Sequence, residues 1–228
     1  MIAVEIIQDI SVVIHPREVL WLQGYRREGE RPKKVVQDMV EEEIEEGRRL
    51  LQPQAICTEV KAEIGEDKIR LENGLALQAG GMSAVWRKAD RLAAVVCTIG
   101  PALEKRVAEL IAQGEEAAAL VLDSFGSAAV EKAAEQVDSH LCQSAAARGM
   151  KIGPRLSPGH GTWPLADQKT IFALLPAHRI GVSINEQGMM VPIKSISFCV
   201  GMGERLESSP KTSPCRYCNM KDCRFRRA

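Results

Sequence analysis

The sequence is poor in aromatic residues, carries no net charge and contains no long apolar run. Phe, Trp and Tyr make up 4% of its 228 residues, and 30 Lys and Arg balance 30 Asp and Glu. Nucleic-acid-binding proteins concentrate positive charge on one surface, so we expect no nucleic-acid partner. No apolar stretch reaches the roughly 18 residues that a membrane-spanning helix needs. We therefore expect no membrane partner either.

The chain also lacks the marks of a secreted protein. Its N-terminus carries acidic residues where a signal peptide would carry Lys or Arg. The seven Cys are an odd number, and three of them crowd the C-terminus instead of forming an evenly paired framework. We predict a cytoplasmic protein. No strand–Gly-x-Gly–helix motif opens the chain, so a dinucleotide-type βαβ unit is not expected.

Hydrophobic periodicity predicts a mixture of strands and helices. The expected strands cover residues 2–14, 54–63, 67–72 and 92–97 and, around a turn, 180–185 and 190–202. The expected helices cover residues 15–25, 33–51, 80–88, 102–112 and 115–149. In the last of these, Gly126 and Ser127 predict a kink or a break.

Residues 155–164, RLSPGHGTWP, are the least ordinary stretch of the chain. Proline fixes φ and glycine accepts positive φ, so this loop is expected to hold a compact shape. It carries one permanent cation, Arg155, whose planar guanidinium can hold a carboxylate with two parallel hydrogen bonds. Such a loop suits a small zwitterion such as an amino acid. The alternative is a Pro/Gly turn with a surface arginine.

The motifs, taken together, resemble one known family. Their order is Arg155-x-Ser157-Pro158-Gly159-His160, then Trp163-Pro164-Leu165, then Met190-x-Pro192-x-x-Ser195-x-Ser197. This order resembles the activation (reactivation) domain of vitamin B12 (cobalamin)-dependent methionine synthase, in a stand-alone form. The similarity covers residues 90–203 well and the N-terminal third more loosely. It implies an α+β fold, with a curved, mainly antiparallel sheet and flanking helices, over residues 1–205, followed by a Cys-rich tail over residues 206–228.

The resemblance also implies a ligand and its contacts. The family binds S-adenosylmethionine in a groove beside the sheet, and Arg155 matches the residue that holds the methionine carboxylate. Ser157 matches a residue that offers its backbone to the ligand, and Pro158 and Gly159 complete this part of the predicted site. Glu131 best matches the glutamate that contacts the ligand's amino group. Glu135, one helical turn further on the same face, is the second choice.

The activity that the resemblance implies is methyl transfer from S-adenosylmethionine to oxidised cobalamin on a partner. That partner is a cobalamin-binding methionine synthase subunit or another corrinoid protein, and a reductant such as flavodoxin or ferredoxin supplies an electron. Catalysis then depends on holding the methyl group in line with the cobalt. His160 stands where the family commonly has Tyr, on the side that faces the cobalt, and is the predicted catalytic residue.

The C-terminal cysteines form a separate motif. Cys215, Cys218 and Cys223 have the spacing C-x2-C-x4-C, which lets thiolates converge on one metal ion or cluster. Three thiolates are a partial set, which Cys199 or a partner protein would complete. An iron–sulfur cluster, a zinc ion and free thiols without metal all remain open.

Two other functions compete with reactivation. The first is a non-catalytic module that senses S-adenosylmethionine or assembles a corrinoid complex, with the tail as a structural metal site. The second, an ordinary methyltransferase for small molecules, is disfavoured by the missing nucleotide-binding motif.

Overall fold

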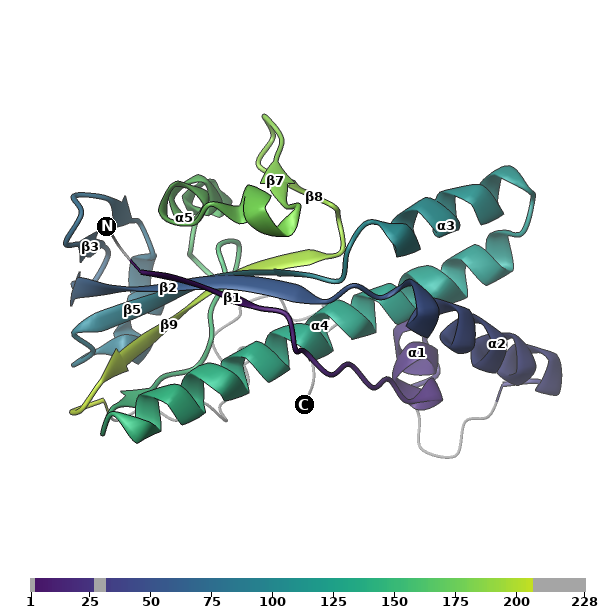
Figure 1. The fold of residues 1–228 in the computed structure, drawn as a ribbon, viewed down its shortest axis with the longest axis horizontal. Helices are drawn as coiled ribbons and strands as arrows, with labels where there is room; N and C mark the ends of the chain where they lie inside the picture. Colours follow the sequence, from purple (N-terminus) through teal and green to yellow (C-terminus); the bar gives the residue numbers. More distant parts are fainter. Residues whose placement is uncertain (1–2, 27–31, 207–228) are drawn as a thin grey trace.

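A curved antiparallel sheet lies at the centre of the computed structural model, which describes residues 3–26 and 32–206 (Figure 1). The strands of the sheet follow the order β4-β3-β2-β5-β9-β6, and β1 also pairs with β2. Their bounds are β1 Val4–Ile7, β2 Gln54–Ile64, β3 Ile69–Leu71, β4 Ala76–Leu77, β5 Arg91–Thr98, β6 Lys151–Ile152 and β9 Ser195–Gly203. This arrangement confirms the predicted α+β fold with a curved antiparallel sheet and flanking helices.

Helices cover the sheet on both faces (Figure 1). The α-helices are α1 Pro16–Leu22, α2 Lys34–Leu50, α3 Ala102–Ala112, α4 Glu116–Ala147 and α5 Gln168–Leu174. The 3-10 turns are η1 Gly80–Trp86, η2 Leu165–Asp167 and η3 Ala177–Ile180, and a small hairpin pairs β7 Ser183–Ile184 with β8 Met190–Val191. The long helix α4 crosses one face of the sheet, whereas α5 and the hairpin lie on the other, and α1, α2 and α3 gather beyond one end.

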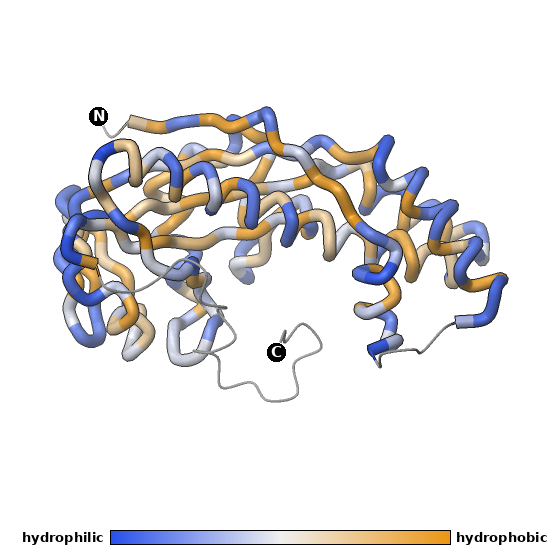
Figure 2. The backbone as a smooth tube through the Cα atoms, turned by 90° about the horizontal axis from the view of Figure 1, so that it is seen from below, coloured by the Kyte–Doolittle hydropathy of each residue, from blue (hydrophilic) through white to orange (hydrophobic). Residues whose placement is uncertain are grey.

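Two hydrophobic cores result, one on each face of the sheet. The helix-side core lies between the sheet and α1–α4 and includes Phe125, Val95 and Phe198. The loop-side core lies between the sheet and the segments η1, α5 and η3, and it includes Trp86 and Trp163. Successive side chains of a strand point to opposite faces, so β5 contributes side chains to both cores. Figure 2 shows the strands in the middle as largely hydrophobic, with hydrophilic segments gathered at the periphery.

Several predicted elements differ from those observed. The strand expected over 2–14 is paired only over Val4–Ile7. The expected interruption of the long helix is wrong, because α4 runs unbroken through Gly126 and Ser127. Gly126 serves a different purpose. A Cβ there would lie 2.7 Å from Leu103 Cδ2, so the glycine lets α3 approach α4 closely.

The chain between the loop and the last strand also folds differently from the expectation. Helix α5 was not predicted, and the strand expected over 190–202 is divided into β8 and β9. β8 pairs only with β7, whereas β9 joins the central sheet between β5 and β6. Within the described ranges, no helix is both long enough and apolar enough to cross a membrane.

Candidate functional site

The loop that carries Arg155 is fixed to the edge of the sheet by backbone hydrogen bonds. Past β6 the chain continues along β9: Gly153 N donates to Gly201 O at 2.9 Å, and Leu156 and Cys199 exchange bonds of 3.0 and 2.8 Å. Because neighbours in extended backbone point to opposite faces, Leu156 enters the loop-side core. Arg155 lies on the other face, with its guanidinium carbon 5.5 Å from the centroid of the Phe198 ring.

Arg155 and Glu131 form the centre of the site. Arg155 Nη2 donates to Glu131 Oε2 at 2.7 Å, and the side chains are 15% and 43% exposed, respectively. The guanidinium is therefore shielded from water, while the carboxylate faces partly outward. The two residues predicted to hold opposite ends of a zwitterion are thus brought together. A free amino acid can separate such a pair by offering its carboxylate to the arginine and its ammonium to the glutamate.

A third charged group, Asp138, lies on the same helix near this pair. It follows Glu131 by seven residues, or two helical turns, and therefore shares its face of α4. Its Oδ1 atom is buried and has no hydrogen-bond partner. Burial raises the pKa of Asp138 to about 6; nearby Arg155 opposes this shift and Glu135 adds to it. Asp138 was not predicted from the sequence, although its helical spacing from Glu131 could have indicated it.

His160 and Ser157 close the tip of the loop on itself. His160 N donates to Ser157 O at 3.0 Å, and Ser157 N donates to His160 Nδ1 at 3.2 Å. Burial lowers the pKa of His160, with Arg155 contributing in the same direction and Glu131 opposing it. The imidazole is therefore neutral, with its hydrogen on Nε2. The Ser157 N–H that was predicted to serve the ligand is used by His160 in this structure.

The remaining predicted binding residues shape the same turn. Pro158 is buried, whereas Gly159 is exposed and has a φ of 92°. Gly159 N donates to Trp163 O at 2.9 Å, so the turn is closed by a second backbone bond. A positive φ of this size favours glycine, which explains why this residue stands at this point of the loop.

Two tryptophans and a buried carboxylate hold the loop from the opposite face. Trp86 Nε1 donates to Pro154 O at 2.9 Å, and Trp163 Nε1 donates to Asp167 Oδ2 at 2.7 Å. The two indoles meet edge to face, with centroids 5.8 Å apart. Asp167 is 6% exposed and also accepts a bond from Gln78 N. The residues on either side of Arg155 are thereby anchored, a role that was not predicted for Trp163.

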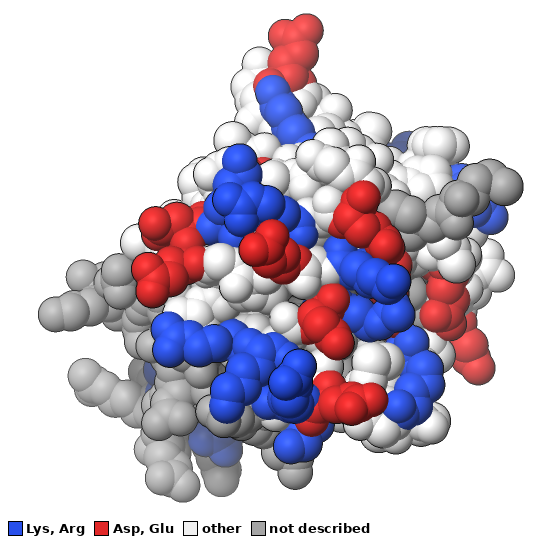
Figure 3. Space-filling view, turned by 90° about the vertical axis from the view of Figure 1, so that its left-hand side faces the viewer, with Lys and Arg blue, Asp and Glu red and all other residues white. Residues whose placement is uncertain are grey.

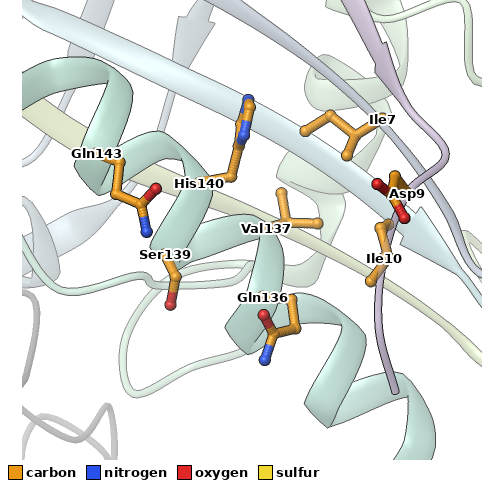
Figure 4. A pocket seen from close by; sticks show the side chains of 8 residues that line it. All are labelled: Ile7, Asp9, Ile10, Gln136, Val137, Ser139, His140 and Gln143. Carbon is orange, nitrogen blue, oxygen red and sulfur yellow. The ribbon is translucent and has the colours of Figure 1, made fainter. Parts of the chain in front are cut away.

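A separate hollow of about 180 Å³ lies along the opposite edge of α4. Its lining comes from the segment around the end of β1 and from α4: Ile7, Asp9, Ile10, Gln136, Val137, Ser139, His140 and Gln143 (Figure 4). His140 Nε2 lies 3.0 Å from Glu5 Oε1 of β1. None of the predicted site residues lines this hollow, so it is distinct from the Arg155 site.

The predicted metal ligands Cys215, Cys218 and Cys223 lie outside the described residues. Cys199, considered as a fourth ligand, is fully buried in the loop-side core, and burial raises its pKa. It stays a protonated thiol among apolar side chains, so the proposal that it completes the set is not supported. Over residues 3–26 and 32–206, no cluster of three or more His, Cys, Asp or Glu is arranged to hold a metal ion.

Charges of both signs are interspersed at the end of the molecule that Figure 3 faces. Some form exposed pairs, such as Arg70 with Glu63 at 3.6 Å. Arg148 likewise pairs with Glu59 of β2, from just beyond the last residue of α4. Surface pairs of this kind contribute little to stability, and the charged groups that matter for a ligand are the shielded ones around Arg155.

Comparison with known proteins identifies the fold. No protein-family model matches the chain, and no curated protein matches it. Among solved structures, it is similar to the crystal structure of the MetH reactivation domain bound to AdoHcy, with a TM-score of 0.62 and 16% sequence identity. The match covers 93% of this chain and 80% of that chain. At this identity the likeness establishes the fold, which is that of the MetH reactivation domain.

Proposed function

We propose that this protein binds S-adenosylmethionine and uses it to re-methylate oxidised cobalamin held by a partner protein. The observation that carries the proposal is the shielded ion pair between Arg155 and Glu131. The resemblance assigns Arg155 to the carboxylate of the ligand and Glu131 to its amino group, and a domain of the same fold was solved with AdoHcy. AdoHcy is the product that remains when S-adenosylmethionine gives up its methyl group.

The residues of this site are proposed to recognise the ligand and not to carry out acid–base chemistry. Arg155 would hold the methionine carboxylate, and Glu131 would hold the ammonium that replaces the guanidinium as its partner. Methyl transfer to cobalt needs no general base, since a reductant delivers one electron to cobalt(II) and the sulfonium supplies the methyl cation. The contribution of the protein is to fix the donor relative to the acceptor.

His160 remains the residue proposed to face the corrinoid. Its neutral imidazole already uses Nδ1 to accept the Ser157 N–H, which leaves the Nε2 hydrogen free to donate to the corrinoid or to a water molecule on the cobalt. Binding of the ligand to the Ser157 backbone would require His160 to release that N–H. The ring is therefore proposed to respond to the ligand as well as to the cobalamin.

The cysteine tail is proposed to bind a metal: an iron–sulfur cluster would relay the electron for the same reaction, whereas zinc would be structural. Cys215, Cys218 and Cys223 would bind an iron–sulfur cluster or zinc, and the proposed partners are a corrinoid protein and a reductant such as flavodoxin or ferredoxin. Replacing Cys215 and Cys218 by Ser should remove any bound metal and leave S-adenosylmethionine binding unchanged. Metal analysis and ligand titration of the same preparation check both parts.

Calorimetric titration with S-adenosylmethionine tests the proposal directly. The wild-type protein should bind saturably, and Arg155→Ala should weaken binding by about 2–3 kcal/mol, the scale of a lost charge-assisted hydrogen-bond pair. Arg70→Ala removes an exposed arginine of β3 and serves as the matched control. Unchanged affinity in Arg155→Ala would exclude Arg155 from the site. Absence of binding to the wild type would refute the proposed function.

A reactivation assay separates catalysis from mere binding. Cobalt(II) cobalamin on a corrinoid protein, a low-potential reductant and S-adenosylmethionine should yield methylcobalamin only when this protein is present, and its absorbance spectrum identifies it. Binding of S-adenosylmethionine without any methylcobalamin would instead favour the sensing or assembly module.

A further inference from the structure

We propose that Glu43 makes the packing of α2 on α4 depend on pH. Helix α2 packs most tightly while the carboxyl group of Glu43 carries a proton, and it opens locally more often once that group is ionised. This inference does not rest on the proposed function, because α2 lies in the group of helices beyond one end of the sheet, apart from the Arg155 site (Figure 1).

Glu43 lies on the face of α2 that packs into the helix-side core. The residues that α2 buries are Val40, Glu43, Ile44 and Gly47, which recur at the three- and four-residue spacing of one helical face. Glu43 is 6% exposed and is the only ionisable residue among these four. At Gly47 a Cβ would lie 2.4 Å from Phe125 Cδ1, so the interface between α2 and α4 has no spare room at that point.

The carboxyl group of Glu43 has lost water without gaining a partner for both of its oxygens. Its Oε2 atom is buried and has no hydrogen-bond partner. The cation that acts on Glu43, Arg106 of α3, is held elsewhere: its Nε donates to Glu46 Oε1 at 2.7 Å, and its Nη1 lies 3.6 Å from Glu109 Oε2. Burying a carboxylate without a partner is costly, whereas the protonated acid avoids the cost of burying a charge.

Most of the surrounding charges act in the same direction as burial. Burial is the main cause that raises the pKa of Glu43; Glu46 and Glu42 of the same helix and Glu115, which precedes α4, raise it further, and Arg106 opposes them. In the unfolded chain a glutamate titrates at about 4.3, so the folded state holds this proton more tightly. The resulting stabilisation is complete below about pH 4 and is lost as the pH rises through the higher pKa of the folded state.

The ionised carboxylate destabilises the contact of α2 more than the rest of the fold. Separation of α2 from α4 returns Glu43 to water, whereas the central sheet and the loop of Arg155 keep their own hydrogen bonds. Proteins open locally where one cooperative segment can separate at a smaller free-energy cost than global unfolding. Ionisation of Glu43 therefore increases the population of molecules in which α2 is open and the sheet is still folded.

Native-state hydrogen exchange of the full-length protein tests this inference. Protection factors of amides in α2 and in the central strand β5 are measured between about pH 4 and about pH 8, each corrected for the intrinsic exchange rate. In the wild type, the protection of α2 relative to β5 should fall as the pH rises, by about tenfold for each unit by which the pKa of Glu43 is raised. In Glu43→Gln, which cannot ionise, this ratio should not change with pH. Glu41→Gln removes an exposed carboxylate of the same helix and should behave as the wild type does.

A second variant keeps the test decisive if Glu43→Gln does not fold. Glu43→Met fills a similar volume without a charge, and its ratio of α2 to β5 protection should likewise be independent of pH. A ratio that is constant in the wild type would overturn the inference, and so would a ratio that falls equally in the wild type and in the uncharged variant.

Calorimetric titration of the same proteins with S-adenosylmethionine separates this result from the proposed function. Glu43→Gln should bind the ligand as the wild type does, because the opening is confined to α2. Weaker binding in Glu43→Gln would show that the effect reaches the Arg155 site and would overturn the inference. A wild type that binds no S-adenosylmethionine would refute the proposed function, and the hydrogen-exchange result would still decide the role of Glu43.

Discussion

The two cores of this protein are built in different ways. The helix-side core is made mostly of aliphatic side chains and alanines around Phe125 and Phe198, and its helices pack closely where a glycine leaves room. At Gly47 of α2, a Cβ would lie 2.4 Å from Phe125 Cδ1. The loop-side core instead contains two indoles at right angles, Trp86 and Trp163, whose N–H groups are bonded to Pro154 O and to Asp167.

The two cores therefore contribute different things to the candidate site. The helix-side face supplies charges, because Glu131 of α4 pairs with Arg155 and Asp138 lies two helical turns further along the same helix. The loop-side face supplies position, because the polar bonds of its tryptophans fix the backbone on either side of Arg155. Directional hydrogen bonds in a dry core specify one geometry, whereas aliphatic packing tolerates adjustment. The site forms where the two meet, at the edge of β9.

A matched pair of glycine substitutions, one in each core, tests whether only the loop-side core positions the candidate site. In Gly201→Ala, a Cβ would lie 2.5 Å from Trp86 Cγ, and in Gly47→Ala it would lie 2.4 Å from Phe125 Cδ1. Each should lower the free energy of unfolding by about 2–3 kcal/mol through overpacking. Only Gly201→Ala should also weaken S-adenosylmethionine binding, since it displaces the indole that holds Pro154. Denaturation curves and ligand titration measure the two effects.

Equal loss of ligand affinity in both variants, under conditions where both remain folded, would contradict the idea that the two cores contribute differently to the site. It would mean that the position of Arg155 depends on the whole sheet and not on the loop-side core alone.

A smaller effect is expected from Asp167→Asn. The carboxylate accepts bonds from Trp163 Nε1 and from Gln78 N, and its replacement by a neutral amide should cost about 1–2 kcal/mol of unfolding free energy. Trp163 should then shift its fluorescence toward longer wavelength as the loop loosens. Unchanged emission together with unchanged stability would show that these bonds do not hold the loop.

Hydrophobic periodicity and the positions of proline predicted many of the strands and helices, because these elements depend on residues close together in the chain. The buried run of β5 and the amphipathic α2 have clear periods, and Pro16 begins α1, where its missing N–H costs nothing. The seven-residue α5 was missed because a helix this short, between Pro164 and Pro176, leaves too little periodicity to recognise. The reason for a glycine at position 126 within α4 is the close approach of Leu103, which no local pattern reveals.

The contacts within the candidate site were harder to predict from the sequence than the strands and helices. Arg155 was singled out from its Pro/Gly loop and Glu131 through a family resemblance, and the fold brings Arg155 Nη2 within 2.7 Å of Glu131 Oε2. Their ion pair crosses from α4 to the loop, so spacing along the chain could not reveal it. Asp138 has the helical spacing of a site residue, but its unpartnered oxygen is a property of tertiary packing. The bond between Ser157 N and His160 Nδ1 likewise depends on the closed turn.

The last prediction concerns the pH dependence of stability that Asp138 causes on the helix-side face. Its pKa is raised to about 6 by burial, and the charged groups near it are Arg155 and Glu135. In the unfolded chain an aspartate titrates near 4, so the folded state holds the proton more tightly. The resulting stabilisation is complete below about pH 4 and is lost as the pH rises through about 6. Since the residue is only half-buried, we expect roughly 1–2 kcal/mol.

Asp138→Asn should abolish this loss, so the difference in unfolding free energy between variant and wild type should grow between pH 4 and pH 7. His160 acts in the opposite direction: its lowered pKa gives stability above pH 6.5 that is lost on acidification, and it contributes equally to both proteins. Parallel pH profiles of unfolding free energy for Asp138→Asn and the wild type would contradict the raised pKa of Asp138.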